Sequence, residues 1–290
     1  MLEKGILDLR NLPSDEFEEL WNKIVLPDDV KTQLQAQVLL ELTFRTQIKS
    51  KAAIPLHGII LLVGPPGTGK TSIAKGVASA AVSALNNAKV KFIEVEPHTL
   101  SSSALGKSQR EIRRFLEEVV TEYAKQGPLI VLLDEVETLV SDRSKMSLEA
   151  NPVDVHRATD AMLAGLDNLA ARFPQLLFIA TSNFEGALDP AFISRADLVL
   201  RIEKPTREAC ESILRDTLSA IADKWKDVKK IMADAKFQKI VDEAEGLDGR
   251  QIRKAVLGAL THSISTVLNP GLLTSQQLLK SLKQAKAVKI

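Results

Sequence analysis

The sequence predicts a three-layer α/β domain with a parallel sheet of five strands, followed by a small all-helical domain. Three observations predict this organisation. Short apolar runs alternate with helical patterns, such runs stop after Pro205, and a glycine-rich loop joins the first run to a helix. The 290 residues are enough for two domains, and a hydrophobic content of 45% suffices for a core and excludes a disordered chain.

The N-terminal region is predicted to be helical between about Glu16 and Gln47. Apolar residues recur there at helix spacing, as Leu34, Val38, Leu39 and Leu42. We therefore expect residues 1–50 to form an N-terminal helical linker segment.

Five apolar runs are typical of strands buried on both faces of a parallel sheet. They are Gly58–Val63, Val90–Val95, Leu129–Leu133, Leu176–Thr181 and Leu198–Ile202. Helical patterns lie between them at Thr71–Leu85, Ser108–Tyr123 and Val155–Ala170. Because strand alternates with helix, residues 51–204 are predicted to form the α/β domain.

Residues 205–290 are predicted to form the helical domain, with the boundary near Glu203–Thr206. Two apolar stripes at helix spacing support this: Ile213, Leu214, Leu218 and Ile221 form the first, and Ile252, Val256, Leu260, Ile264 and Val267 form the second.

Composition excludes several classes of protein. The 38 Lys and Arg residues nearly balance 37 Asp and Glu, so the net charge of +1 gives no electrostatic case for a nucleic-acid or anionic-membrane partner. The single Cys210 excludes an internal disulfide framework. No pair among the four histidines has zinc-ligand spacing. We find neither a bilayer-spanning apolar segment nor a signal peptide, and expect a cytoplasmic protein.

A phosphate-binding loop follows the first predicted strand. The sequence GPPGTGKT fits the pattern GxxxxGK[ST], and the helical pattern that continues through Ser72 supplies the required context. Glycines let backbone N–H groups turn toward phosphate oxygens, while the lysine reaches the β- and γ-phosphates and the final hydroxyl binds Mg²⁺. The predicted nucleotide-binding residues are Gly64, Pro65, Pro66, Gly67, Thr68, Gly69, Lys70, Thr71 and Ser72.

Two acidic residues, Asp134 and Glu135, end the third buried run. Charge at the end of a buried strand is costly unless it has a partner, which a magnesium–nucleotide complex supplies. We expect Asp134, with Thr71, to hold Mg²⁺ and Glu135 to act on the attacking water as a general base or orienting group. Taken alone, the pair is also compatible with a solvent-exposed strand end.

Asn183 follows the fourth buried run, where its amide is suited to positioning water near the γ-phosphate. The alternative is an ordinary turn residue. Arg195 precedes the fifth run, and its alternative is a surface salt bridge with Asp197.

Arg250 lies in the first turn of a helix that Asp248 is predicted to cap, with Gln251 three residues later. A cation there meets the unfavourable end of the helix dipole, and a nearby phosphate would offset that cost. The alternative is an ion pair with Asp248 or Glu245.

With these motifs in this order, the chain resembles AAA+ ATPases. The segments DEVETL, TSN, SRAD and EGLDGRQIRK are similar to those of the pachytene-checkpoint group, also called thyroid-receptor-interacting ATPases, which remodel HORMA-domain proteins. The resemblance covers about Phe17–Thr266. It implies a P-loop AAA+ domain with a helical lid, ATP and Mg²⁺ as ligands, and a hexameric ring.

The resemblance also implies residue roles. Arg195 takes the place of the arginine finger, which completes the neighbouring subunit's site, and Arg250 takes the sensor-2 position. The short segment before the phosphate loop leads us to expect a minimal bacterial version. Such versions regulate antiphage operons that encode HORMA proteins and a cyclic-nucleotide synthase.

The chain departs from the group at two places. Ser194 replaces the first finger arginine, and the first pore loop has Ala104 and Leu105 in place of an aromatic residue. A second pore loop is expected within Ser141–Asp154, with Arg143, Lys145 and Glu149 as candidates.

Two other functions are compatible with a phosphate loop: a nucleic-acid AAA+ machine, such as a clamp or helicase loader, and a nucleotide-dependent scaffold without turnover. Balanced charge argues against the first. The set of Asp134, Glu135, Asn183 and Arg195 argues against the second.

Overall fold

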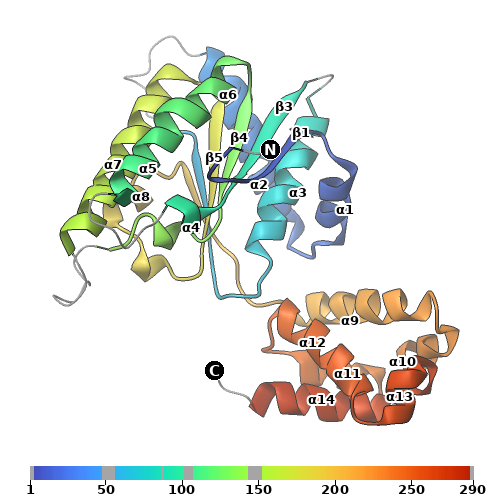
Figure 1. Ribbon diagram of the computed structural model, residues 1–290. Helices are drawn as coiled ribbons and strands as arrows, with labels where there is room; N and C mark the ends of the chain where they lie inside the picture. Colours follow the sequence, from blue (N-terminus) through green and yellow to red (C-terminus); the bar gives the residue numbers. More distant parts are fainter. Residues whose placement is uncertain (1–2, 48–55, 86–87, 101–106, 143–151, 288–290) are drawn as a thin grey trace. The chain divides into compact units, whose positions relative to one another are not determined.

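Figure 1 shows the computed structural model of the chain, which describes residues 3–47, 56–85, 88–100, 107–142 and 152–287. The chain divides into two compact units. The first comprises Met1–Gly64 and Lys70–Ile202, and the second comprises Pro65–Gly69 and Glu203–Ile290. Residues 65–69 therefore group with the C-terminal residues.

The first unit contains a six-stranded sheet in the order β1-β3-β4-β5-β2-β6. The five predicted strands are confirmed, and they are parallel to one another. Their bounds are β2 (Ile59–Val63), β3 (Val90–Val95), β4 (Leu129–Leu133), β5 (Leu176–Ser182) and β6 (Leu198–Arg201). The carboxyl ends of these strands consequently lie along one edge of the sheet.

The sixth strand, β1 (Ile6–Leu12), was not predicted, because the sequence indicated only helices in this region. It runs antiparallel to β3 at the edge of the sheet. Only its end residues, Ile6 and Leu12, are buried, and Arg10 between them donates a hydrogen bond to Asp8. An edge strand has one neighbour and tolerates polar side chains, so the apolar signal of a central strand is missing.

Helices cover both faces of the sheet in the first unit (Figure 1). Along β2 the side chains alternate between two cores. Ile59, Leu61 and Val63 join one hydrophobic cluster, whereas Ile60 and Leu62 join the other. The elements that cover the second cluster are α1 (Asp15–Lys23), α2 (Asp28–Gln47) and α3 (Lys70–Ser83). The first cluster lies under α5 (Lys107–Arg114), a π-helical turn (Phe115–Val120), α6 (Thr121–Lys125) and α7 (Pro152–Arg172).

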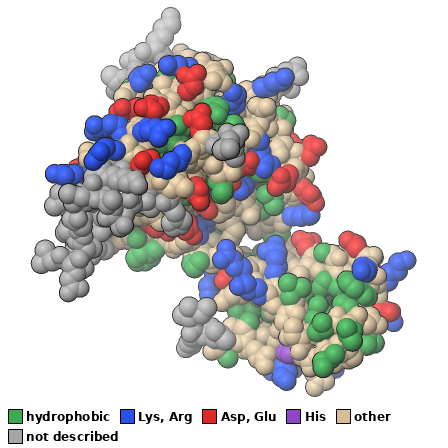
Figure 2. All heavy atoms as spheres, in the orientation of Figure 1, with side chains coloured by type: hydrophobic (Ala, Val, Ile, Leu, Met, Phe, Trp, Pro, Cys, Tyr) green, Lys and Arg blue, Asp and Glu red, His purple; other side chains and the backbone are tan. Residues whose placement is uncertain are grey.

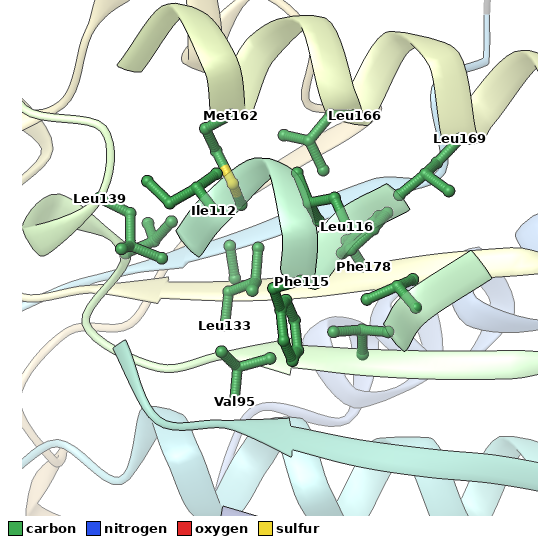
Figure 3. Close-up of a cluster of buried hydrophobic side chains, with 14 of the residues drawn as sticks. Val95, Ile112, Phe115, Leu116, Leu133, Leu139, Met162, Leu166, Leu169 and Phe178 are labelled. Atoms are coloured by element: carbon green, nitrogen blue, oxygen red, sulfur yellow. The ribbon is translucent and has the colours of Figure 1, made fainter. Parts of the chain in front are cut away.

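Figure 3 shows how α7 is fixed to the sheet. Its side chains Met162, Leu166 and Leu169 point toward Phe115 and Leu116 of the π-helical turn, above Leu133 and Phe178 of the strands. Burial of this many apolar side chains, each worth about 1.5–3 kcal/mol, makes α7 a rigid support. Short elements complete the first unit: α4 (Pro97–Leu100), α8 (Pro190–Ile193), and 3₁₀ turns at Val136–Thr138 and Glu185–Ala187.

The second unit is helical, as predicted. It contains α9 (Arg207–Ala222), α10 (Lys229–Ala233), α11 (Phe237–Ala244), α12 (Gly249–Leu260), α13 (Ile264–Leu268) and α14 (Ser275–Ala287), with 3₁₀ turns at Lys226–Val228 and Pro270–Leu272. Its own core includes Leu214, Leu218, Ile240, Val256 and Leu278.

The predicted continuous stripe from Ile252 to Val267 is wrong in its second half. Helix α12 ends at Leu260, and Ser263 caps a new helix, α13. Because the chain turns between the two helices, Ile264 and Val267 lie on the surface and not in the core.

Figure 2 shows that Lys and Arg side chains mingle with Asp and Glu on the visible face of the first unit. This agrees with the balanced composition. Across the described ranges, we find no helix with the length and apolar character that crossing a membrane requires.

Candidate active site

Three neighbouring strands bring the predicted site residues of the first unit to the same edge of the sheet. Strand β5 pairs with β4 on one side and with β2 on the other. Gly64 follows β2, Asp134 and Glu135 follow β4, and Asn183 follows β5. Parallel strands of an α/β sheet place ligand-binding residues at their carboxyl ends in this way.

Lys70, the first residue of α3, is 6% exposed. Its ammonium group donates to the Gly64 carbonyl oxygen at 2.8 Å and to Asn183 Oδ1 at 3.0 Å. A buried cation needs partners of this kind to offset the loss of water. Lys70 is therefore held at the base of the predicted phosphate loop, next to Asn183.

The Asp134 carboxylate accepts hydrogen bonds from two hydroxyl groups. Thr71 Oγ1 donates to Asp134 Oδ1 at 2.8 Å, and Thr181 Oγ1 donates to the same oxygen at 2.6 Å. Mg²⁺ prefers oxygen ligands, and in phosphate sites it uses one or two carboxylates together with water and phosphate oxygens. The hydroxyl of Thr71 and the carboxylate of Asp134 fit such a site.

No cluster of three or more His, Cys, Asp or Glu residues suited to a metal occurs in the described parts of the chain. This is compatible with a Mg²⁺ ion that takes most of its ligands from the nucleotide and water. The described residues therefore give no support for a metal site built from protein side chains alone.

Glu135 has a left-handed backbone conformation, with φ 50° and ψ 51°. For a residue other than glycine this conformation costs about 1–3 kcal/mol, and such strain is concentrated at functional sites. The backbone N–H of Glu135 donates to Thr181 Oγ1 at 3.1 Å, and the 3₁₀ turn Val136–Thr138 begins immediately afterward. Thr181 thereby helps to hold the strained residue.

Asn183 connects the predicted nucleotide-binding lysine, Lys70, with the predicted general base, Glu135. Its Nδ2 donates to Glu135 Oε1 at 3.2 Å, while its Oδ1 accepts from Lys70. Its backbone N–H donates to Glu137 Oε1 at 3.1 Å. Hydrogen bonds at the amide oxygen, the amide nitrogen and the backbone N–H thus hold Asn183 in place.

Thr181 and Glu137 belong to this network but were not predicted as site residues. Thr181 lies in a strand that is apolar apart from its last residues, and its position two residues before Asn183 was the available signal. Glu137 lies two residues after Glu135. It contacts Asn183 from the 3₁₀ turn that follows the left-handed Glu135, and the sequence does not indicate this local conformation.

Arg195 follows α8 and forms an ion pair with Asp167 of α7. Arg195 Nε and Nη2 donate to the two Asp167 carboxylate oxygens, each at 2.8 Å, and Nη1 donates to the Ala191 carbonyl oxygen at 2.6 Å. The hydrogen bond from Arg195 lowers the pKa of Asp167 below its ordinary value.

The alternative in which Arg195 pairs with Asp197 is wrong. The Asp197 carboxylate instead accepts hydrogen bonds from the backbone N–H groups of His57, Gly58 and Ile59, at 3.0, 2.6 and 3.0 Å. These donors lie at the amino end of β2, so Asp197 fastens the start of β6 to the start of β2.

In the second unit, the predicted helix cap at Asp248 is confirmed. Asp248 Oδ1 accepts from the Gln251 N–H at 2.8 Å, and Gln251 Oε1 accepts from the Asp248 N–H at 2.9 Å. The Asp248 carboxylate also lies against Gly67, which has φ +82°, so a side chain at position 67 would collide with it. A glycine is required there for both reasons.

Arg250 lies in the first turn of α12 and is exposed. Among the ion pairs of the described residues, none joins Arg250 to Asp248 or to Glu245. Glu245 instead pairs with Arg207 at 3.5 Å. Arg250 lines a cavity of about 1210 Å³ in the second unit, together with Pro65, Pro66 and Gly67. The lining has four Lys or Arg residues, Lys204, Arg250, Lys254 and Lys286, against two acidic residues, Glu245 and Asp248. This balance favours an anionic ligand.

The predicted pore loops lie outside the described residues. Ala104 and Leu105 fall within residues 101–106, and most of Ser141–Asp154, with Arg143, Lys145 and Glu149, falls within residues 143–151.

Comparison with known proteins identifies close relatives of this arrangement. Residues 60–204 match the family described as "ATPase family associated with various cellular activities (AAA)". The chain is 47% identical to CD-NTase-associated protein 6 of Pseudomonas aeruginosa over 289 residues, which cover 100% of this chain and 95% of the relative. It is 30% identical over 280 residues to putative pachytene checkpoint protein 2 of Caenorhabditis elegans, covering 89% of this chain and 65% of that protein.

Solved structures give the same result for the fold. The structure of C. elegans PCH-2 matches with a TM-score of 0.76 and 26% identity, over 98% of this chain and 76% of that chain. A chain in the structure of the E. coli MS115-1 HORMA:CdnC:Trip13 complex matches with a TM-score of 0.76 and 17% identity, over 97% of this chain and 95% of that chain.

Proposed function

The chain belongs to the AAA family of ATPases, and from this premise we propose that it hydrolyses ATP in a homo-oligomeric ring and uses the energy to remodel HORMA-domain proteins. The observation that carries the proposal is the contact of Asn183 with both Lys70 and Glu135. One side chain there joins the cation proposed to bind phosphate to the carboxylate proposed to act on water.

The binding step uses the loop between Gly64 and Thr71. Its backbone N–H groups and the Lys70 ammonium group bind the phosphates of ATP. Thr71 and Asp134 are the residues that would hold Mg²⁺, which neutralises phosphate charge when bound. The hydrogen bond of 2.8 Å between Thr71 Oγ1 and Asp134 Oδ1 keeps these two oxygens close together.

The hydrolysis step uses Glu135, which accepts the proton of the attacking water, and Asn183, which orients that water. Arg195 of a neighbouring copy stabilises the charge that develops on the transferred phosphoryl group. Arg250, from the positively charged cavity of the second unit, contacts the nucleotide phosphates.

The proposed partner class rests on the relatives. One relative is named CD-NTase-associated protein 6, others are named pachytene checkpoint protein 2, and a matching chain comes from a complex that contains HORMA, CdnC and Trip13. We propose that this chain likewise acts on a HORMA-domain protein in a bacterial cyclic-nucleotide antiphage system, as a hexameric ring.

The test compares Glu135→Gln with Lys70→Ala. Glu135→Gln removes the general base but keeps Lys70, so it should bind ATP, release phosphate at least about 100-fold more slowly and accumulate in the HORMA-bound form. Lys70→Ala should lose ATP affinity in calorimetry. Glu118→Gln, a control on the exposed surface, should behave as wild type. Near-normal turnover by Glu135→Gln would exclude the assigned base.

A second experiment tests the partner class. The wild-type protein is incubated with ATP and a bacterial HORMA-domain protein, and unfolding of the HORMA domain is followed by protease sensitivity. We expect sensitivity to rise with ATP and to stay at its basal level with Glu135→Gln. An ATPase that is stimulated by DNA, with steep salt dependence, and that leaves the HORMA protein intact would favour the nucleic-acid alternative.

A further inference from the structure

The guanidinium group of Arg195 uses only some of its N–H donors within the chain. A guanidinium has five N–H donors in a planar fork. Three of them are used, by the two Asp167 oxygens and the Ala191 carbonyl oxygen. One N–H on each terminal nitrogen, Nη1 and Nη2, therefore has no acceptor in the described parts of the chain. Paired N–H groups of this kind bind phosphate in a bidentate manner.

Asp167 is itself held rigidly. It lies on α7 between Leu166 and Leu169, which are buried in the core against the sheet, and Figure 3 shows both leucines pointing into that core. The Asp167 side chain is 43% exposed and that of Arg195 is 24% exposed. The pair thus lies at the surface, where another molecule can reach it, while its acidic member is attached to a firmly packed helix.

We propose that Asp167 is a positioning residue for the arginine finger: it orients Arg195 so that the two remaining N–H groups bind the terminal phosphate of ATP on a neighbouring copy of the chain. The inference rests on the proposed function, in which Arg195 acts across a subunit boundary. Arginine has a large rotamer entropy, and a bidentate contact within the free chain removes most of that freedom before the neighbour arrives.

The opposite role is that of a latch, in which Asp167 restrains Arg195 and must release it before the finger acts. The donor count argues against a latch, because the contact with Asp167 leaves an N–H on each terminal nitrogen available. The two roles predict opposite effects of removing the Asp167 carboxylate. Loss of a positioning residue lowers kcat, whereas loss of a latch raises it.

The experiment is a double-mutant cycle. It compares four full-length proteins in the assembled state: the wild type, Asp167→Asn, Arg195→Ala and the double variant. The kcat and KM for ATP are measured for each. Asp167→Asn should lower kcat by about 10-fold, since asparagine keeps one acceptor but turns its NH₂ toward an arginine donor, with KM changed less than about 2-fold. In the Arg195→Ala background the same substitution should change nothing. Equal effects in both backgrounds, or a raised kcat, would overturn the inference.

Two further measurements separate positioning from folding. Asp167→Glu retains a carboxylate and should recover more activity than Asp167→Asn. Asp242→Asn is the matched control, because Asp242 accepts from Arg207 Nε and Nη2 at 3.0 and 2.8 Å on the surface of the second unit. It should keep wild-type kcat, and its thermal midpoint should resemble that of Asp167→Asn. If Asp167→Asn lost activity only in proportion to a lower thermal midpoint, the contact would be structural.

A mixing experiment tests the direction of action. Lys70→Ala copies bind no ATP but carry an intact finger, whereas Asp167→Asn copies bind ATP and carry a misaligned one. Their mixture should exceed the summed activity of the two alone, and a mixture that equals the sum would contradict an action on the neighbouring site. If Arg195→Ala kept full activity, the finger assignment would fail, and that result is distinct from a failure of Asp167 alone.

Discussion

The side-chain nitrogen of Asn183 lies 3.2 Å from a carboxylate oxygen of Glu135. Because the oxygen of the same amide accepts from Lys70, the lysine proposed to bind phosphate and the glutamate proposed to act on water are joined through one side chain. Under the proposed function, a phosphate group bound by Lys70 would compete with Asn183 for the ammonium group, which couples nucleotide binding to the position of the amide.

Replacement of Asn183 tests this relationship. Asn183→Ala removes both side-chain contacts and should lower kcat by about 100-fold, with a smaller change in KM, because the lost contacts act mainly on the reaction step. Steady-state phosphate release measures both constants. Asn22→Ala, at an exposed position of α1, is the control and should leave both unchanged. A rise in KM alone would instead assign Asn183 to ground-state binding.

Thr181→Val tests whether the unpredicted hydroxyl supports the site. The valine has the same shape but leaves the Glu135 N–H without its acceptor and Asp134 with one hydroxyl donor fewer. An unsatisfied group of this kind costs about 1–3 kcal/mol. We expect the free energy of unfolding to fall by that amount and the turnover rate to fall by a factor of about 10 or more.

The matched control for Thr181→Val is Thr159→Val. Thr159 is 0% exposed, and its hydroxyl oxygen has no hydrogen-bond partner among the described residues. The same substitution there removes a buried polar group without breaking a bond, so it should leave stability equal or higher. Urea unfolding measures both variants. Equal loss in both would show that the Thr181 bonds contribute nothing specific.

The buried Glu41 of α2 predicts a dependence of stability on pH. Burial, followed by the nearby negative charge of Asp197, raises the pKa of Glu41 from 4.5 to about 7, against the opposing effects of Arg45 and Gln37. The folded protein thus holds a proton that the unfolded chain releases at lower pH. This stabilisation is complete below pH 4.5 and is lost as pH rises through about 7.

Urea unfolding of wild type and Glu41→Gln at pH 5 and pH 8 measures this dependence. The wild type should lose up to about 3 kcal/mol more than Glu41→Gln between the two values. Glu122→Gln, at an exposed position, should retain the wild-type dependence. Parallel pH profiles for wild type and Glu41→Gln would show that Glu41 titrates near its ordinary pKa.

Gly58→Ala tests the close approach of α2 to the sheet. Gly58 has φ +71°, and an added Cβ would collide with the Arg45 guanidinium and lie 2.8 Å from the Leu176 carbonyl oxygen. Arg45 donates to that carbonyl at 2.6 Å, so the collision would break a buried hydrogen bond. We expect a loss of about 3 kcal/mol or more in the free energy of unfolding.

Gly246→Ala is the control for Gly58→Ala. Gly246 has a similar positive φ, +82°, but an added Cβ would meet nothing within 4 Å. The difference between the two variants measures the collision separately from the backbone strain. Equal losses would show that Arg45 moves away without cost.

Much of the fold is predictable because its signals are local. The apolar runs that became β2 to β6 report burial on both faces, and the phosphate loop has a fixed pattern between a strand and a helix. The edge strand β1 was missed because a strand with one neighbour needs no apolar run. The break between α12 and α13 was missed because the apolar periodicity continues across Thr261–Ser263 while the backbone turns.

Within the site, the residue types that phosphate chemistry requires were predictable, but their supporting contacts were not. Asp167 lies 28 positions from Arg195 and Thr181 lies 47 from Asp134. Such pairs come together only through the order of the strands and the packing of α7. The left-handed conformation of Glu135, which immediately precedes the turn that carries Glu137, is not indicated by its residue type.

Strand β2 carries Gly64 at one end, and at the other its first N–H groups are bound by Asp197, two residues from Arg195. An extended backbone has no slack, because each residue already spans close to its maximum length. The five residues of β2 therefore span roughly 15 Å between the predicted phosphate loop and the backbone N–H groups that Asp197 binds. Under the proposed function, displacement of the loop by a nucleotide would be carried along this extended segment toward the residues next to Arg195, and so toward the neighbouring copy.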